Sequence, residues 1–297
     1  MRVLTIVAAL LIAATAPPAF GAEPDWKAVD AIFARSAAQS GDVHRYAFPR
    51  SDLTVTLDGV TIKTALGLGG WVAFKPMGDE AMIMGDLVLT ESEVNPVMAS
   101  LLAGGVTVTA VHNHLLRASP ATFYMHVGGH GDPAKIAEAI RAALALSATP
   151  LTVPPAVAVP ATALDFDTAG LEDAIGLKGR VNGGVYQFSA PRADAVKDSG
   201  MVVAPAMGLT NVINFQPTGD GKAAITGDFV ALANEVNPLI GALRSSNIEV
   251  TAVHNHMLNE EPRTFFIHFW ANDDAIKLAR GIRAALDQTN VPAKGVQ

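Results

Sequence analysis

The chain has 297 residues, of which 50% are hydrophobic and 16% are charged, so it is too apolar for a disordered or fibrous protein and indicates a large core. Its 21 basic and 28 acidic residues give a net charge of -7, which is the wrong sign for binding phosphates, so nucleic acid is not an expected partner. The absence of cysteine excludes disulfides, zinc ribbons, iron–sulfur ligation, cysteine nucleophiles and a lipid-modified N-terminal cysteine.

Residues 1–22 have the pattern of a secretory signal peptide. One basic residue, Arg2, precedes an apolar run from Val3 to Ala14, and small residues lead to a cleavage site after Gly21. The apolar run is shorter than the about 20 residues that a membrane span requires. We therefore expect an exported protein, periplasmic or secreted after cleavage, with no stable membrane anchor.

The rest of the chain is a tandem duplication. Residues 84–144 align on residues 226–286 without a gap, at a constant offset of 142, and about half of the positions are identical. With short slips the similarity extends upstream, so each unit spans about 120 residues. We expect one unit at 23–146, a Pro-rich connector at 147–164 and a second unit at 165–297.

Each unit has the pattern β-β-β-α-β-β-α. In the first unit, Asn95 and Pro96 predict the N-cap and first residue of a short helix that ends at Gly104. Residues rich in Val and Thr then predict a hairpin, and Asp132 opens a closing helix. The expected strands are 70–74, 81–84, 106–114 and 122–127 in the first unit and 210–215, 223–226, 248–256 and 264–270 in the second.

This order predicts an α+β fold. Strands grouped between helices favour a sheet, antiparallel or mixed, with helices packed on one face. Because the two units share one pattern, we expect them to be related by pseudo-two-fold symmetry.

Histidines form the principal candidate site. In a strand, residues two apart share a face, so His112 and His114 project together. If the hairpin is centred near Ser119, His126 lies directly opposite His112 on the neighbouring strand. The second unit repeats the triad with His254, His256 and His268.

Three histidines with an open fourth position are typical of a catalytic divalent metal site. Zinc is the expected ion, and copper is the alternative because imidazole suits both metals. The competing interpretation is a packed cluster, since a histidine on an apolar strand face is usually a satisfied core residue. All three histidines recur in the second unit although about half of the positions differ, which favours a metal site.

Four carboxylates are weaker candidates for a fourth ligand or a general base. Glu93 and Glu235 precede a helix, where interaction with the helix macrodipole is the structural alternative. Asp86 and Asp228 follow glycine at a predicted strand or turn junction, where turn chemistry explains them equally. No GxSxG, Gly-rich nucleotide loop, EF-hand loop or HExxH occurs, so no other catalytic or cofactor motif is expected.

These motifs together resemble one family. A signal sequence followed by two units with Glu-Val-Asn-Pro, Thr-Ala-Val-His-Asn-His and a closing Ile-Arg-Ala-Ala-Leu resembles the LppY/LpqO family of exported bacterial proteins. The most specific segment is 235–270, and 93–127 matches the same pattern less closely. The resemblance implies export and duplication, and it implies no particular activity.

Three classes of function remain open. The first is an exported metal-dependent enzyme, such as a hydrolase, with the histidines as ligands and Glu93 or Glu235 as base. The second is a periplasmic binding protein for a metal or small molecule, with its site between the units. The third is a structural module with packed histidines. The sequence alone does not decide whether the protein is an enzyme, and it leaves the oligomeric state open.

Overall fold

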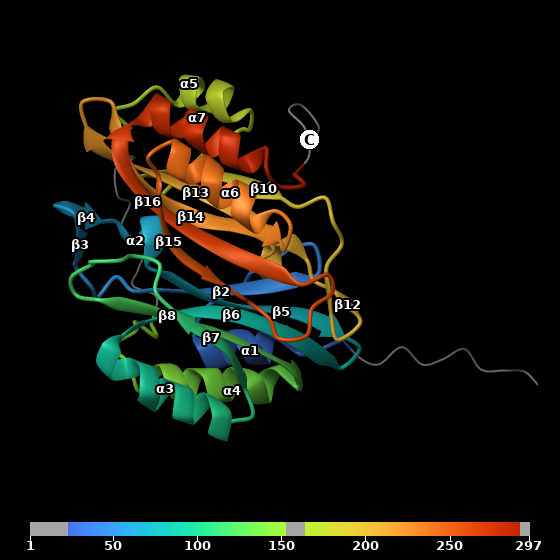
Figure 1. Cartoon of the computed structure of the whole chain (residues 1–297). Helices are drawn as coiled ribbons and strands as arrows, with labels where there is room; N and C mark the ends of the chain where they lie inside the picture. Colours follow the sequence, from blue (N-terminus) through green and yellow to red (C-terminus); the bar gives the residue numbers. More distant parts are fainter. Residues whose placement is uncertain (1–22, 153–163, 292–297) are drawn as a thin grey trace, which may run out of the picture.

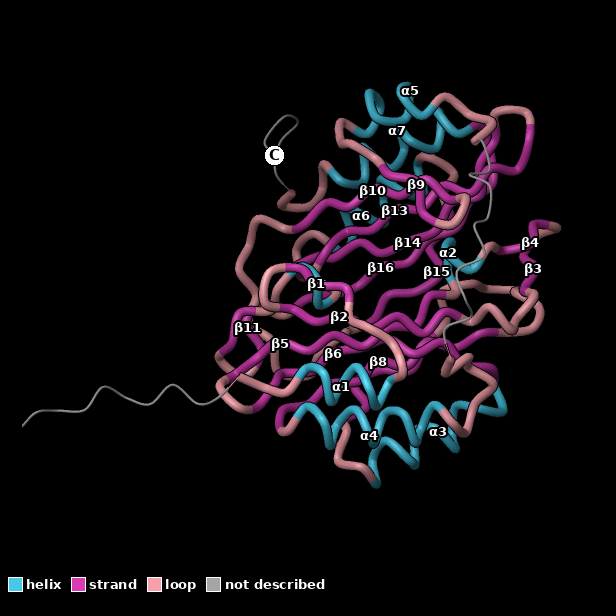
Figure 2. The backbone as a smooth tube through the Cα atoms, turned by 180° about the vertical axis from the view of Figure 1, so that it is seen from behind, coloured by secondary structure: helices cyan, strands magenta, loops and turns pink. Residues whose placement is uncertain are grey.

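The protein has four layers, helix, sheet, sheet and helix, in a computed structural model that describes residues 23–152 and 164–291. The expected signal peptide and the middle of the expected connector, 153–163, lie outside the described residues. Figure 1 shows the two sheets facing each other at the centre, with α3 and α4 below and α5 and α7 above. The view from behind shows the same layering, with α1 beside α4 on the outer side of the first sheet (Figure 2).

The first unit contains one six-stranded antiparallel sheet, in the order β1-β2-β5-β6-β8-β7. Three longer helices cover its outer face, and a short hairpin and a short helix lie between β2 and β5. The elements are α1 (Trp26–Phe33), β1 (Ala38–Ser40), β2 (Val43–Pro49), β3 (Val55–Leu57), β4 (Val60–Ile62), α2 (Thr64–Gly67), β5 (Gly69–Met77), β6 (Glu80–Thr90), α3 (Glu91–Ala103), β7 (Thr107–His112), β8 (Thr122–Gly131) and α4 (Pro133–Leu144).

The second unit repeats this arrangement with the strand order β9-β10-β13-β14-β16-β15. A small two-stranded ribbon and a 3-10 turn again stand between the second and third strands of the sheet. The elements are α5 (Thr168–Ile175), β9 (Arg180–Asn182), β10 (Val185–Pro191), β11 (Lys197–Asp198), β12 (Met201–Val202), η1 (Pro205–Met207), β13 (Thr210–Gly219), β14 (Lys222–Leu232), α6 (Val236–Ser245), β15 (Glu249–His254), β16 (Thr264–Asp274) and α7 (Ala275–Leu286). The predicted fold class, two repeated antiparallel sheets with helices on one face, is confirmed.

The central strands are buried on both faces. In β6, Ile83 and Leu87 belong to the core beneath the helices, whereas Met82 and Met84 pack between the sheets. Alternate residues of a strand point to opposite faces, so a strand covered on both sides needs apolar residues at nearly every position. The high apolar content of the sequence follows from this double burial.

The two units share an apolar core between the sheets, and a segment of the first unit also contacts the sheet of the second. One inner core joins Trp71 and Met84 of the first unit to Val230 and Phe266 of the second. The segment before β5 also reaches the second sheet, where the side chain of Gln216 accepts a 2.8 Å hydrogen bond from the Lys63 backbone. The units therefore form one body with a continuous interior between the sheets.

Both hairpins and both closing helices lie where the sequence predicts them, but the middle helix of each unit starts earlier than predicted. Helix α6 begins at Val236 with Glu235 as its N-cap, so Asn237 and Pro238, which repeat Asn95 and Pro96, lie inside it. Helix α3 begins at Glu91, five residues before Pro96, with Thr90 as its N-cap. The Glu93 carboxylate accepts a 2.7 Å hydrogen bond from the Thr90 backbone and completes a capping box. Asn95 is thus inside the helix and caps nothing, and Pro96 is an interior residue.

A buried ion pair fastens this helix to the sheet. Arg50 is fully buried and donates 2.7 Å and 2.8 Å hydrogen bonds to Glu93 and to the Val88 carbonyl of β6. Glu93 also accepts a 2.8 Å bond from the backbone of Ala148, which follows α4. In the second unit, Arg192 and Glu235 make the equivalent 2.6 Å pair. Glu93 and Glu235, which the sequence analysis named as candidate catalytic residues, therefore have structural partners.

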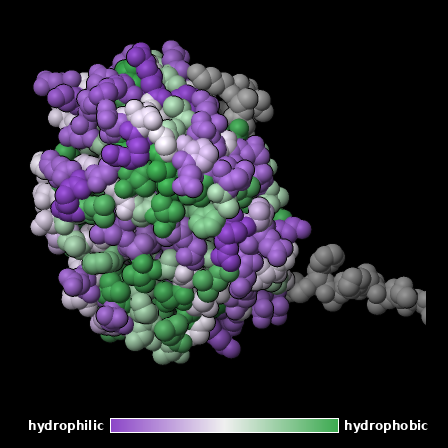
Figure 3. Space-filling view, in the orientation of Figure 1, coloured by the Kyte–Doolittle hydropathy of each residue, from purple (hydrophilic) through white to green (hydrophobic). Residues whose placement is uncertain are grey.

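The surface facing the viewer in Figure 1 is mixed in polarity. Figure 3 shows apolar patches across the middle and lower part of this face among polar residues. Exposed apolar side chains include Val111 of β7 and Val253 of β15, two edge strands that contact each other. Within the described ranges, no helix is long and apolar enough to cross a membrane.

We predict that replacing Glu93 by Ala lowers the free energy of unfolding by about 3–5 kcal/mol, because it leaves the buried guanidinium of Arg50 with only part of its partners. Chemical denaturation measures the change. The matched control is Lys277→Ala, which removes a half-exposed pair with Asp273 and should change stability little. Equal stability of Glu93→Ala and the parent protein would contradict a structural role for the pair.

The same pair predicts a dependence of stability on pH. Burial raises the pKa of Glu93, but hydrogen bonds from Arg50 and two backbone amides outweigh it, so the net pKa is lowered. A lowered folded-state pKa contributes stability above the unfolded value of about 4.3, and this contribution disappears as the pH falls through the folded value. Denaturation of Glu93→Gln should therefore show a smaller loss of stability on acidification below about pH 4.3 than the parent shows.

Candidate metal centre and adjoining cavity

Beta-bulges aim the histidines into the space between the sheets. In β7, Val108 pairs with Val127 and packs against the outer core, but Ala110 pairs with His126 on the inner face. The bulge at Thr109 supplies one extra residue, so the side chains beyond it change face. The second unit has the same register shift between Val250 and Ala252. A regular strand would place Val106 and Val108 on the same face as His112, which the alternation of the sequence predicts, and the bulge makes this prediction wrong.

The bulge also changes the expected pairing of the hairpin. His112 lies opposite Tyr124, and His126 lies opposite Ala110. His126 is thus a diagonal neighbour of His112, two residues away from the predicted register. His256 and His114 lie beyond the ends of their strands, where the chain turns.

The six histidines form one cluster shared by both units. Their rings stack in three pairs across the units, with centroid distances of 3.6 Å for His112 and His254, 3.5 Å for His114 and His268, and 3.6 Å for His126 and His256. A two-fold exchange of the units maps the first pair onto itself and exchanges the other two. These contacts agree with pseudo-two-fold symmetry and show that the expected triads interleave.

Four of these histidines bring their nitrogen atoms together. The ligand atoms of His112, His114, His254 and His268 all lie within 4.8 Å of one another. The Nε2 atoms of His112 and His114 are 2.8 Å apart, and those of His254 and His268 are 2.7 Å apart. A tetrahedral ion with bonds of 2.0–2.1 Å needs nitrogen atoms about 3.4 Å apart, so small ring rotations would admit it. This set can hold a metal ion.

The hydrogen bonds of His254 and His268 define where their protons lie. The Nδ1 atom of His254 is 2.8 Å from the Asn255 carbonyl oxygen, and that of His268 is 2.9 Å from the Gly227 carbonyl oxygen. A carbonyl oxygen only accepts, so both Nδ1 atoms must carry the proton. In the neutral rings, two Nε2 lone pairs then face each other across 2.7 Å.

Burial keeps most of these imidazoles neutral. Burial, with the neighbouring histidines, lowers the pKa values of His112, His114 and His126 well below the usual range. Burial and the neighbouring His268 lower the pKa of His254 to about 3, and burial lowers that of His256 to about 4. Neutral imidazole is the form that binds metals, so no proton has to be displaced at neutral pH.

Asp86 and Asp228 lie beside the histidines, inside strands β6 and β14 and not at the predicted junctions. Asp86 Oδ1 is 3.6 Å from His126 Nδ1, and Asp228 Oδ1 is 2.8 Å from His268 Nδ1. Burial and the nearby Asp228 raise the pKa of Asp86. Burial also raises the pKa of Asp228, but the interaction with His268 outweighs it and the net pKa is lowered.

The glycine before each aspartate has a steric reason. A Cβ at Gly85 would lie 2.8 Å from the Trp71 carbonyl oxygen, and one at Gly227 would lie 1.9 Å from the Val212 carbonyl oxygen. Both positions therefore require glycine for the close approach of neighbouring strands. The repeated Gly-Asp reflects strand packing together with an inward-facing carboxylate.

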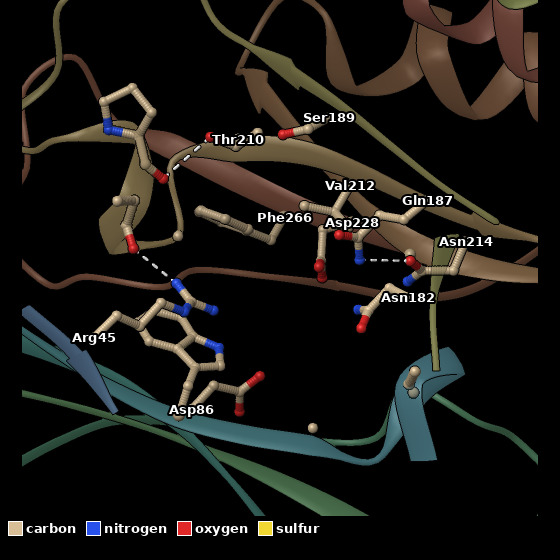
Figure 4. Close-up of a pocket in the computed structure, with 18 of the residues that line it drawn as sticks. Arg45, Asp86, Asn182, Gln187, Ser189, Thr210, Val212, Asn214, Asp228 and Phe266 are labelled. Atoms are coloured by element: carbon tan, nitrogen blue, oxygen red, sulfur yellow. Dashed lines mark hydrogen bonds between the residues drawn. The ribbon is translucent and has the colours of Figure 1, made fainter. Parts of the chain in front are cut away.

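A cavity of about 720 Å³ opens next to the cluster, between the two sheets. Its lining includes both aspartates and three of the six histidines, His114, His126 and His256. In Figure 4, Asp86 and Asp228 project into this space from opposite sheets, and Gln187 and Asn214 line the wall of the second unit. The volume falls in the range of about 300–1,000 Å³ that is usual for small-molecule sites.

Two arginines, Arg45 and Arg180, line this cavity, and Arg45 lies on an aromatic ring. Its guanidinium carbon is 3.7 Å from the centre of the Trp71 ring, and it donates a 2.7 Å hydrogen bond to the Ala206 carbonyl. Burial lowers its pKa to about 10, against the opposing influence of Asp86 and Asp228. The group stays charged at neutral pH, so the cavity combines a cation, two carboxyl groups and the histidines.

Glu93 and Glu235 do not belong to this arrangement. Neither is among the described residues that line the cavity or form the four-histidine set. Their carboxylates bind Arg50 and Arg192 at the outer helices, as described above. A role for them as bases or ligands stays a prediction without a supporting contact.

The sequence interpretation missed the side chains of the cavity wall. Arg45 is the clearest case, because it alternates with Tyr46 and Phe48 in a strand whose other face is buried. A charge on the second face of such a strand is typical of a face that meets water, so the pattern identified the polar face but not the cavity on it. The amides of Gln187 and Asn214, which are joined by a 2.8 Å hydrogen bond, carried no comparable signal.

The chain belongs to the family described as Domain of Unknown Function (DUF1259), which matches residues 27–146 and 169–288. The two matches correspond to the two structural units and establish a tandem-duplicated family. No curated protein sequence matches the chain.

Among solved structures, the chain is similar at low identity to a trimeric bacterial microcompartment shell protein and to two proteins from Clostridium species. A trimeric shell protein, PduB, is 14% identical with a TM-score of 0.22, covering 85% of this chain and 89% of that chain. EtuB from Clostridium kluyveri is 8% identical with a TM-score of 0.19, covering 85% and 90%. EutL from Clostridium perfringens is 9% identical with a TM-score of 0.18, covering 85% and 94%. Similarity at these scores carries no functional inference.

Proposed function

We propose that this protein is an exported divalent-metal-binding protein whose ion is held by His112, His114, His254 and His268. The observation that carries the proposal is the convergence of four imidazoles, whose ligand atoms all lie within 4.8 Å of one another. The Nδ1 atoms of His254 and His268 are in reach of carbonyl oxygens, which leaves their Nε2 atoms to bind an ion. Zinc is the expected ion and copper is the alternative, because both bind neutral imidazole.

The surroundings of the cluster support the same function. Metal-bound histidines usually donate their second ring proton to a carbonyl or carboxylate, which fixes the tautomer and the ring orientation. His254 has a carbonyl partner, and His268 has both a carbonyl and the carboxylate of Asp228. These partners fix the orientation of both rings, with each Nε2 atom toward the centre of the four-histidine set.

We predict that protein purified without chelator retains a divalent ion, and that zinc added to chelator-treated protein raises the melting temperature. An ion at 100 times its Kd stabilises the folded state by about 2.7 kcal/mol. Replacing His114 and His268 together by Ala should abolish most of this effect, because the pair supplies two of the four ligands. Elemental analysis and thermal unfolding measure the two quantities.

The matched control is His130→Ala. His130 is exposed on β8 and is outside the four-histidine set, so its removal should leave both metal content and the thermal shift unchanged. If the parent protein retains no zinc, copper or nickel and none of these ions raises its melting temperature, the cluster is a packing feature and the proposal fails.

A second candidate function is metal-dependent hydrolysis of a small molecule. The cavity favours it, because a substrate there would contact His114, Asp86 and Asp228 directly. An ion that takes a water as a fifth ligand beside the four histidines would acidify that water, and a neighbouring carboxylate would accept its proton during attack. The same cavity also serves a binding protein without catalysis, so only an activity measurement separates the two.

For hydrolysis, we predict turnover of ester or phosphoester test substrates by zinc-loaded protein and none by the chelator-treated form. Asp228→Asn should lower kcat by about 10²–10⁴-fold if Asp228 acts in proton transfer, while zinc content stays the same. Metal-loaded protein that turns over none of these substrates would leave binding as the supported function.

Export is part of the proposal and is supported by the residue pattern of 1–22 and by the LppY/LpqO resemblance. We predict that the chain expressed in a bacterium with its own N-terminus is recovered from the periplasmic or culture fraction without the first 21 or 22 residues. Mass spectrometry of the intact protein identifies the new N-terminus. Full-length protein confined to the cytoplasm would refute export.

A further inference from the structure

Unpartnered polar atoms gather at one end of the histidine cluster. Nine buried side-chain nitrogen or oxygen atoms of the described residues lack a hydrogen-bond partner, and five of them belong to four neighbouring residues. These are Asp86 Oδ1, His112 Nδ1, His126 Nδ1, His126 Nε2 and His256 Nδ1. Leaving a buried polar group unpaired costs about 1–3 kcal/mol, so a concentration of such atoms indicates a missing ligand.

These unpartnered atoms lie next to the four-histidine set. Of the four residues that carry them, only His112 belongs to that set. The stacked rings form two rows of three, with His112 in the middle of its row, 4.6 Å from His126 and 4.8 Å from His114. The four-histidine set occupies the middle pair and the His114–His268 pair. The third stacked pair, His126 and His256, remains without an assigned role.

The pseudo-two-fold relation makes this third pair equivalent to one already assigned. Exchange of the units turns the His114–His268 pair into the His256–His126 pair, because the offset of 142 maps His114 to His256 and His126 to His268. The carboxylates follow the same relation, since Asp86 stands by His126 as Asp228 stands by His268. An ion site at one end of the cluster therefore has a counterpart at the other end.

We propose that a second divalent ion binds His126, His256 and Asp86. The proposal rests on the proposed function, since it extends the same cluster from one ion to two. Imidazole nitrogens with one carboxylate oxygen are an ordinary zinc ligand set, and they differ from the all-histidine set of the first ion.

The second site borders the cavity with all three of its residues, whereas the first site borders it only through His114. His126, His256 and Asp86 all line the cavity, whereas His112, His254 and His268 do not appear among its lining residues. Asp228 has its hydrogen bond to His268, but the corresponding Asp86 oxygen has no partner and is free to bind an ion. The ion at the second site would therefore face the cavity, where a small molecule can reach it.

Native mass spectrometry of the full chain with zinc chloride tests the proposal, because it resolves species with no, one and two ions. The parent protein should bind two zinc ions. His126→Ala and His256→Ala should bind one each, and so should His268→Ala, which removes the other site. His130→Ala is the control and should bind two.

Asp86→Asn keeps the shape of the side chain, so it tests the second site even if the histidine variants fail to fold. It should bind the first ion normally and weaken the second by about tenfold or more, measured by zinc titration. A parent protein that binds one ion, or a His126→Ala variant that binds as many ions as the parent, overturns the second site and leaves the four-histidine site standing. A parent protein that binds none refutes the proposed function itself.

Discussion

Each sheet of this protein has two faces to bury and only one layer of helices to bury them with. Strands such as β6 alternate Ile83 and Leu87, which face the helices, with Met82 and Met84, which face the other sheet. Burial of apolar area stabilises a fold by about 25 cal/mol per Å², so neither inner face can remain in water. The second copy of the unit supplies the cover, and the fold is complete only as a pair.

This pairing determines the chemistry of the interior. Polar residues on the inner faces lose much of their contact with solvent once the sheets close, and the histidines among them find partners in the opposite unit. His112 stacks on its own equivalent, His254, while His114 and His126 stack on the equivalents of each other. Because the duplicated units pack face to face, the three histidines of each unit form one cluster of six.

The sequence predicted the parts of this arrangement that depend on local pattern. The repeated Thr-Ala-Val-His and the capping aspartates Asp132 and Asp274 predict the hairpins and closing helices that the structure contains. The bulge at Thr109 left no such signal, because one extra residue in a strand does not alter the spacing of His112 and His114. The sequence also could not predict that the histidines of the two units stack on each other. The alternation of a strand indicates which residues share a face, but it does not indicate what covers that face.

The two ends of the cluster have diverged under the same symmetry, and the difference is one of hydrogen bonding. The Asp228 carboxylate lies 2.8 Å from His268 Nδ1, and the Gly227 carbonyl oxygen is also in reach, so that ring is held with its lone pair toward His254. The ring of His126 has no such partner, and Asp86 stays 3.6 Å away. A ring that is held costs little to bind an ion, whereas a free ring must be ordered first. Similar residues from one ancestral motif can therefore provide a firm site and a more adaptable one beside the cavity.

Arg45 adds to this asymmetry, because the position that matches it one residue before Tyr186 is the apolar Val185. The first unit thus places Arg45 in the sheet wall of the cavity, whereas the second unit contributes the exposed Arg180 of the edge strand β9, so a ligand entering the cavity meets two chemically different walls.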